Sequence, residues 1–85
     1  MKKMLYAAAL MTVAAPVFAE PSCTPGDATN PVWESLKAFE ETGGKVLSFK
    51  VNEGMCYEIY GEVEGVKMEV FYDPNTGAEL DRIES

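Results

Sequence analysis

Hydrophobic and polar residues alternate along two neighbouring stretches of the chain, 57–63 and 66–72, as half-buried β-strands require. A two-residue turn at Glu64 and Gly65 would join them into a hairpin. The apolar pairs of this register are Val63 with Val66, Gly61 with Met68, Ile59 with Val70, and Tyr57 with Tyr72. The opposite face pairs Glu62 with Lys67, Tyr60 with Glu69, and Glu58 with Phe71. The pattern therefore predicts a hairpin with one apolar and one mostly charged face.

A third strand is predicted before this hairpin, at residues 45–51, where Leu47, Phe49 and Val51 alternate with polar residues. A three-residue connection at 52–54, with Gly54 in the left-handed conformation, would join it to the next strand. The predicted pairs are Val51 with Met55, Phe49 with Tyr57, and Leu47 with Ile59. Both turns then place Tyr57 and Ile59 on the same buried face.

A helix is predicted from residue 31 to Gly43. Asn30 is suited to cap it and Pro31 to occupy its first position. Its apolar stripe consists of Val32, Leu36 and Phe39. Trp33 lies beside this stripe, and we expect it to pack in the core or at its rim, with partial exposure as the alternative.

The pattern after the hairpin predicts a turn at 73–77, because Asp73, Pro74 and Gly77 each suit a turn position. Residues 78–83 follow as an edge strand, in which a bulge would set Leu80 opposite Val70, or as a frayed tail. The fold class is α+β, with one helix packed on an antiparallel meander of three to four strands. The expected core residues of the hairpin are Tyr57, Ile59, Val63, Val66, Met68 and Val70.

The first nineteen residues have the pattern of a cleaved signal peptide. Lys2 and Lys3 precede an apolar run, and Ala19 ends a small-x-Ala cleavage site. The run is shorter than the roughly 20 residues of a membrane-spanning helix. We therefore expect cleavage after Ala19, a periplasmic or secreted protein and no membrane insertion. The predicted organisation is a signal peptide at 1–19, an extended lead-in at 20–30 and a domain at 31–85.

Charge narrows the classes of partner. Removal of residues 1–19 deletes two lysines and leaves five basic side chains against fourteen acidic ones. So acidic a chain is a poor ligand for nucleic acid and anionic lipid, and it favours basic peptides weakly.

Cys23 and Cys56 are the only cysteines, and export would bring them to an oxidising compartment. We expect them to form a disulfide that tethers the lead-in to the sheet, worth roughly 3.5 to 4 kcal/mol from loop entropy. Free thiols or intermolecular pairing are the alternatives. Redox catalysis is disfavoured, because there is no Cys-x-x-Cys spacing.

Catalytic chemistry finds little support. The chain has no histidine, which removes the commonest general base and metal ligand. Glu58, Glu62 and Glu69 are expected on a solvated sheet face, where nothing need raise their pKa values. A calcium loop at 73–79 is disfavoured, because a simple turn explains that segment. We expect neither an enzyme nor a bound metal or cofactor.

Two aromatic residues remain on the polar face, Tyr60 and Phe71, which lie diagonally on adjacent strands. With Lys50, Glu58 and Glu69 they form a candidate partner-binding face. Ordinary packing against neighbouring side-chain stems is the alternative.

The chain resembles small PepSY domains over residues 31–83. The resemblance lies in Gly44-Lys45-Val46, Cys56-Tyr57-Glu58-Ile59-Tyr60, Gly65, Glu69-Val70-Phe71-Tyr72 and Asp73-Pro74-Asn75-Thr76-Gly77. Such domains occur in propeptides of thermolysin-like metallopeptidases, where they inhibit and assist folding, and in bacterial envelope proteins. The resemblance implies a non-catalytic regulatory or binding domain, and it supplies no catalytic or ligand residues.

Two functions follow as hypotheses. The first is a module that binds a protein or an extended peptide, such as an envelope peptidase, on the Tyr60/Phe71 face or by strand addition. Because no peptidase follows Ser85, it would inhibit or regulate that peptidase in trans. The alternative is a small envelope protein that binds a metal ion or another small ligand through its acidic surface.

Overall fold

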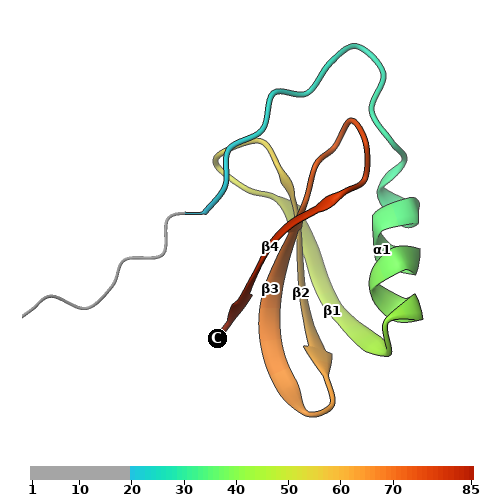
Figure 1. Ribbon diagram of the computed structural model, residues 1–85, viewed down its shortest axis with the longest axis vertical. Coiled ribbons are helices and arrows are strands. Elements are labelled where there is room, and N and C mark those ends of the chain that lie inside the picture. The colour runs from blue at the N-terminus through green and yellow to red at the C-terminus, as the bar shows by residue number, and fades with distance from the viewer. Residues whose placement is uncertain (1–19) are drawn as a thin grey trace, which may run out of the picture.

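The computed structural model describes residues 20–85, so the predicted signal peptide at 1–19 lies outside the described residues. One helix precedes a four-stranded sheet: α1 (Val32–Glu41), β1 (Gly44–Val51), β2 (Tyr57–Val63), β3 (Val66–Tyr72) and β4 (Glu79–Glu84). Neighbouring strands are antiparallel and follow one another in chain order (Figure 1). The α+β class is confirmed, and the last element is a strand.

The β2–β3 hairpin has the predicted register, from Tyr57 opposite Tyr72 to Val63 opposite Val66. Its turn consists of Glu64 and Gly65, whose φ angles are 51° and 84°. Positive φ at both positions is the backbone shape that matches the twist of a two-residue hairpin.

The predicted register between β1 and β2 is wrong by two residues. Val51 pairs with Tyr57 rather than Met55, and Phe49 pairs with Ile59 rather than Tyr57. The loop runs over residues 52–56, because the Asn52 side chain closes it by accepting a hydrogen bond from the Cys56 amide at 2.8 Å. A two-residue shift preserves strand parity, so Phe49 still faces the core.

Leu47 was expected in the core but is 42% exposed. The register shifts between Val46 and Ser48, which leaves Leu47 in a bulge. Val46 takes the core-facing place and packs against the buried cluster. Val51, at the end of the strand, is also exposed.

α1 covers the apolar face over β1 and β2 (Figure 1). It starts one residue later than predicted, and Pro31 occupies the N-cap position. Asn30 does not cap it. Instead, its amide donates to the Pro74 carbonyl and its carbonyl accepts from the Tyr57 hydroxyl, at 2.7 and 2.8 Å. Trp33 does not pack in the core, because it is 59% exposed.

The main core lies between α1 and the sheet. Its buried members are Phe39, Tyr57, Ile59, Met68, Val70 and Tyr72, with Val32, Leu36, Val46, Phe49 and Val63 packed around them. The predicted hairpin core is thus confirmed except at Val66, which is 41% exposed beside the turn.

β4 continues the core-facing side of the sheet with charged residues, since Arg82 lies opposite Val70 and Glu84 opposite Met68. The register shifts between Phe71 and Tyr72, so Leu80 bulges outward and Arg82, not Leu80, lies opposite Val70. The Arg82 guanidinium donates to the Glu79 carboxylate at 2.8 and 2.9 Å, and it lies 3.5 Å from the Met68 sulfur. The long side chain of Arg82, held by its ion pair with Glu79, therefore lies over the core residues Met68 and Val70 of β3.

The lead-in, residues 20–30, arches over the end of the sheet that carries the β1–β2 loop and the β3–β4 turn (Figure 1). Cys23 and Cys56 form the predicted disulfide across 33 positions, and the Cys23 amide donates to the Gly54 carbonyl at 2.7 Å. Cys23 is not its sole anchor, since Asn75 accepts from the Gly26 amide at 2.7 Å and donates to the Thr24 carbonyl at 2.9 Å. The lead-in is therefore part of the fold.

Candidate functional site

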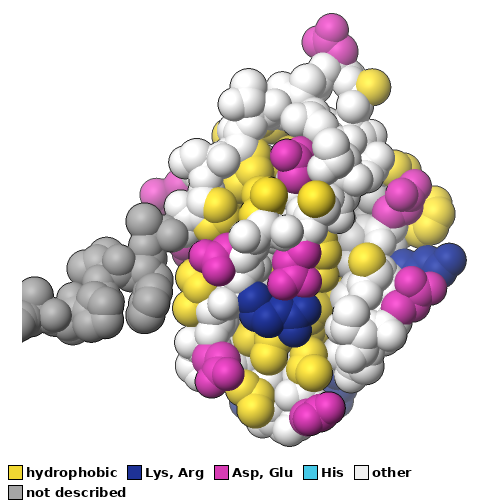
Figure 2. Space-filling model, viewed as in Figure 1, with side chains coloured by type: hydrophobic (Ala, Val, Ile, Leu, Met, Phe, Trp, Pro, Cys, Tyr) yellow, Lys and Arg dark blue, Asp and Glu magenta, His cyan; other side chains and the backbone are white. Residues whose placement is uncertain are grey.

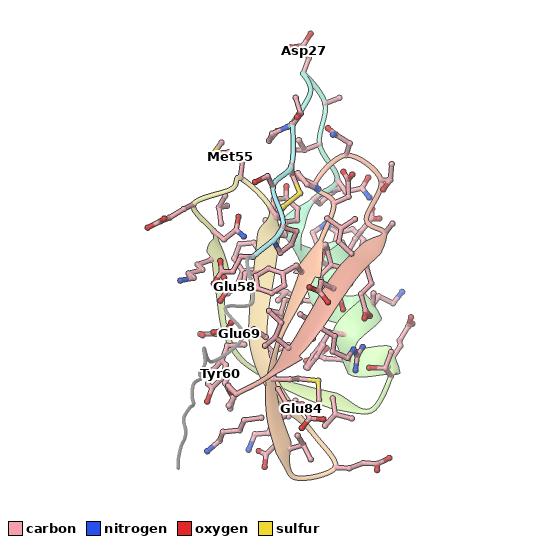
Figure 3. The ribbon with its side chains drawn as sticks, turned by 60° about the vertical axis from the view of Figure 1, so that its left-hand side comes forward. Asp27, Met55, Glu58, Tyr60, Glu69 and Glu84 are labelled. Atoms are coloured by element: carbon pink, nitrogen blue, oxygen red, sulfur yellow. A yellow bond between two sulfur atoms is a disulfide. The ribbon has the colours of Figure 1, made fainter. Side chains whose placement is uncertain are left out.

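Three carboxylates meet on the sheet face opposite the helix. They belong to Glu20 in the lead-in, Glu58 on β2 and Glu69 on β3, and their ligand oxygens lie within 4.8 Å of one another. Glu58 and Tyr60 are two residues apart on β2 and therefore share one face of the sheet. Glu69 on β3 pairs with Tyr60, so its side chain lies on the same face as that of Glu58 (Figure 3). We call these three residues the carboxylate cluster.

Glu58 is the buried member of the carboxylate cluster. The residue is only 3% exposed, whereas Glu20 is exposed and Glu69 is half-buried. Burial raises the pKa of the Glu58 carboxyl, and the charges of Glu69 and Glu20 add to the rise, while Lys50 opposes it. The expectation that this face holds only solvated carboxylates of ordinary pKa is therefore wrong at Glu58.

Lys50 on β1 is the neighbouring cation. It pairs with Glu58 across the strands, and its ammonium nitrogen lies 3.9 Å from Glu58 Oε1. That distance is too long for a hydrogen bond, and Oε1 has no hydrogen-bond partner among the described residues. The Lys50 side chain is 65% exposed, so its charge is largely screened by solvent.

Asn52 positions the lead-in beside the carboxylate cluster. This buried side chain donates to Glu20 Oε1 and to the Pro21 carbonyl, both at 3.2 Å, and also accepts from the Cys56 amide. The adjacent Cys23–Cys56 disulfide ties the same two segments together. Glu20 is thus placed over the sheet by a covalent bond and a buried amide.

An open depression of about 530 Å³ lies beside the carboxylate cluster. Its lining residues are Glu20, Ser22, Lys50, Glu53 and Gly54. The carboxylates can bind a cation or share a proton. Neither a free thiol nor an imidazole is available to this arrangement, since both cysteines are in the disulfide and the chain has no histidine.

The two aromatic residues of the predicted binding face differ in accessibility. Phe71 is fully buried, and Tyr60 is half-buried. Phe71 therefore offers no area to a partner in this conformation. A binding role for Tyr60, Lys50, Glu58 and Glu69 stays a prediction.

The segment at 73–79 behaves as a turn. One carboxylate oxygen of Asp73 accepts from the amides of Asn75 and Thr76, at 2.7 and 3.4 Å. Glu79 pairs with Arg82, which lowers the Glu79 pKa through their hydrogen bonds. One carboxylate oxygen of Asp73, the side-chain oxygen of Asn75 and both carboxylate oxygens of Glu79 are thus already hydrogen-bonded within the protein.

Sequence patterns missed two functional candidates, Glu20 and Asn52. Strand alternation places Glu58 and Glu69 on one face, but it carries no information about a segment that crosses from elsewhere in the chain. The pair of cysteines was the available signal, because a Cys23–Cys56 bond brings residues near 20 to residues near 56.

Figure 2 shows acidic side chains (magenta) distributed over one face of the molecule, with far fewer basic ones (dark blue). Within residues 20–85, no helix has the length and apolar character needed to cross a membrane. The model of a protein family, PepSY_2, described as peptidase propeptide and YPEB domain, matches residues 3–82. The chain belongs to this family. No significant match to this PepSY protein was found among curated proteins or among solved structures.

The family match covers the features described above. PepSY propeptide-like domains are generally non-catalytic and are associated with peptidase regulation. The matched residues include both partners of the disulfide and all three members of the carboxylate cluster. The lead-in thus lies inside the region that the family model matches.

Proposed function

We propose that this PepSY protein is a non-catalytic binding module that regulates a peptidase in trans. The observation that carries the proposal is the match of a peptidase-propeptide family to residues 3–82. A propeptide domain acts by occupying part of its peptidase, and peptidases bind polypeptides in extended form. A module that binds a peptidase in this mode would present an extended strand whose outward backbone groups are free to pair with it.

The outer edge of β1 suits that task. β1 ends the sheet on one side, and no other described strand pairs with its outer edge. Leu47 and Val51 on β1 and Met55 in the following loop are 42%, 49% and 52% exposed. Backbone groups at this edge would bind a partner strand, and the exposed apolar side chains would add contact area.

β4, the opposite edge, is less suited to strand addition. The Asp81 carboxylate accepts a hydrogen bond from the Arg82 amide at 2.8 Å. The Ser85 amide donates inward to the Lys67 carbonyl, so by alternation the Arg82 amide belongs to the outward row. An outward amide that is already bonded is not free for an incoming strand.

The experiment compares two matched substitutions, Leu47→Lys and Leu80→Lys. Both leucines lie at bulges of edge strands and are similarly exposed, at 42% and 44%. Hydrolysis of a fluorogenic peptide by a thermolysin-like metallopeptidase, and by peptidases of the source envelope, is measured with increasing PepSY protein. We expect wild type and Leu80→Lys to slow hydrolysis and Leu47→Lys to lose at least tenfold in potency. Unchanged hydrolysis with wild type across these peptidases would refute the proposal, and equal potency of the two variants would refute the β1 edge.

We further infer that the protein acts after export. The basic start and apolar run of residues 1–19 support a signal peptide, and the Cys23–Cys56 pair suits an oxidising compartment. Intact-mass measurement of the protein from the periplasmic fraction should give a chain that begins at Glu20. A chain retaining residues 1–19, or one confined to the cytoplasm, would contradict export.

A further inference from the structure

The most unusual group on the molecule is the buried oxygen Oε1 of Glu58. Its residue is 97% buried, and the oxygen has no hydrogen-bond partner among the described residues. Buried carboxylate oxygens in folded proteins are normally hydrogen-bonded or bound to a cation, because loss of hydration is costly. Two further carboxylates, those of Glu20 and Glu69, approach the same place. An uncompensated negative site of this kind calls for a positive ligand.

Lys50 supplies only part of the missing positive charge. Its ammonium is 3.9 Å from Glu58 Oε1, and its side chain is mostly in solvent. One screened positive charge faces three carboxylates. The net charge of the group is therefore strongly negative while all three are ionised.

We propose that the carboxylate cluster of Glu20, Glu58 and Glu69 binds a divalent cation, with calcium as the preferred ion. Three ligand oxygens within 4.8 Å of one another lie at most about 2.8 Å from a common centre, so side-chain shifts of a few tenths of an ångström bring all three to the usual calcium–oxygen distance of about 2.4 Å. The donors are all carboxylate oxygens, which favour calcium, magnesium or manganese over zinc or copper. Calcium fits best because carboxylates can bind it through both oxygens and because it tolerates irregular geometry.

The cation would join three separate parts of the chain. Glu20 belongs to the lead-in, Glu58 to β2 and Glu69 to β3. The ion would therefore fasten the start of the lead-in to the sheet, next to the Cys23–Cys56 disulfide. Lys50 can swing away as the ion arrives, because its side chain is exposed.

The test measures calcium binding by calorimetry on the disulfide-bonded protein purified after export, with its N-terminus identified by mass. Three carboxylates near the surface suggest a dissociation constant of about 10⁻⁴ to 10⁻³ M, as in extracellular calcium modules. The unfolding temperature should then rise by several degrees in about 10 mM calcium, relative to sodium chloride of equal ionic strength. Magnesium and manganese are titrated in parallel.

The variants locate the ion. Glu58→Gln and Glu69→Gln should each weaken calcium binding at least tenfold, and Lys50→Met should strengthen it severalfold. Glu62→Gln is the matched control, because Glu62 lies on the same strand and pairs with Lys67 outside the carboxylate cluster. Its affinity should equal that of wild type. Far-UV circular dichroism without calcium checks that each variant is folded.

Three results would overturn the proposal. The first is the absence of binding to wild type by calcium, magnesium and manganese alike. The second is calcium binding by Glu58→Gln with wild-type affinity. The third is a raised pKa of the α-amino group of Glu20 that falls in Glu58→Gln, in a protein that binds no divalent ion, because the chain's own ammonium would then be the cation.

Discussion

The ammonium of Lys50 lies 3.9 Å from Oε1 of Glu58, and the Lys50 side chain is 65% exposed whereas that of Glu58 is 4% exposed. The pair is thus unequal, because Glu58 has lost its water and Lys50 has not. Removing the buried charge should therefore stabilise the protein at neutral pH. We expect Glu58→Gln to raise the free energy of unfolding at pH 7 by on the order of 1 kcal/mol in the presence of a chelator.

The pH dependence of this effect follows from the raised pKa of Glu58. The folded protein holds this proton more tightly than the unfolded chain, so protonated Glu58 stabilises wild type fully below the ordinary carboxyl pKa of 4.5, and this contribution is lost as pH rises through the folded-state pKa. Urea unfolding of wild type and Glu58→Gln should converge as pH falls. A constant difference at every pH would contradict this, and Glu62→Gln serves as the control.

The disulfide should contribute a large share of the stability. It closes a separation of 33 residues, for which loop entropy gives roughly 3.5 to 4 kcal/mol. A Cys23→Ser, Cys56→Ser double variant should lose about this much free energy of unfolding in a urea titration. Alkylation before intact-mass analysis should label no cysteine in wild type. Two labels, or a double variant as stable as wild type, would contradict a structural disulfide.

Gly54 should tolerate no side chain, because the lead-in passes directly over it. A Cβ at Gly54 would lie 2.5 Å from the Pro21 carbonyl oxygen and 2.9 Å from the Ser22 Cα. Gly54→Ala should therefore cost about 1 to 3 kcal/mol, as other overpacked sites do. Gly26→Ala is the control, since its Cβ would meet Asn75 at an ordinary 3.4 Å. Equal unfolding free energies for the two variants would contradict this packing.

Trp33 provides an optical check, because it is the chain's single tryptophan and is 59% exposed. Acrylamide should quench its fluorescence nearly as strongly in the native protein as in urea. Trp33→Phe should change the free energy of unfolding by less than about 0.5 kcal/mol, as surface substitutions do. A blue-shifted, protected emission would place Trp33 in a packed environment instead.

The parts of the fold that could be predicted are those that depend on neighbouring residues. The β2–β3 register was predictable for two reasons. Glu64 and Gly65 suit a two-residue turn, and folding the chain there sets each core-facing residue of β2 opposite an apolar residue of β3. Strand parity placed Phe49 correctly even though the loop before β2 was misjudged. There, Met55 takes a positive φ of 71°, which the sequence suggested for Gly54.

The parts that could not be predicted are strand irregularities and contacts with distant segments. Period-two alternation cannot locate an extra residue, so it missed the bulge at Leu47, and the bulge expected in the last strand sets Arg82 rather than Leu80 opposite Val70. Glu58 looks solvated in the strand pattern, and its burial depends on tertiary packing that strand alternation does not represent. The carboxylate cluster was missed for the same reason, because Glu20 is placed by Asn52 and the disulfide rather than by its own surroundings.

The Cys23–Cys56 bond also bears on the peptidase regulation that we propose. Residues 24–31 lie outside the helix and the strands and are largely exposed. They lie between the two cysteines, so hydrolysis of any bond among them would leave both fragments joined through sulfur. The hydrogen bonds of Asn75 with Gly26 and Thr24, and of Asn30 with Pro74, would also hold the two ends beside the β3–β4 turn. Under the proposed function, one cut by the peptidase in this segment would therefore leave the regulator covalently in one piece.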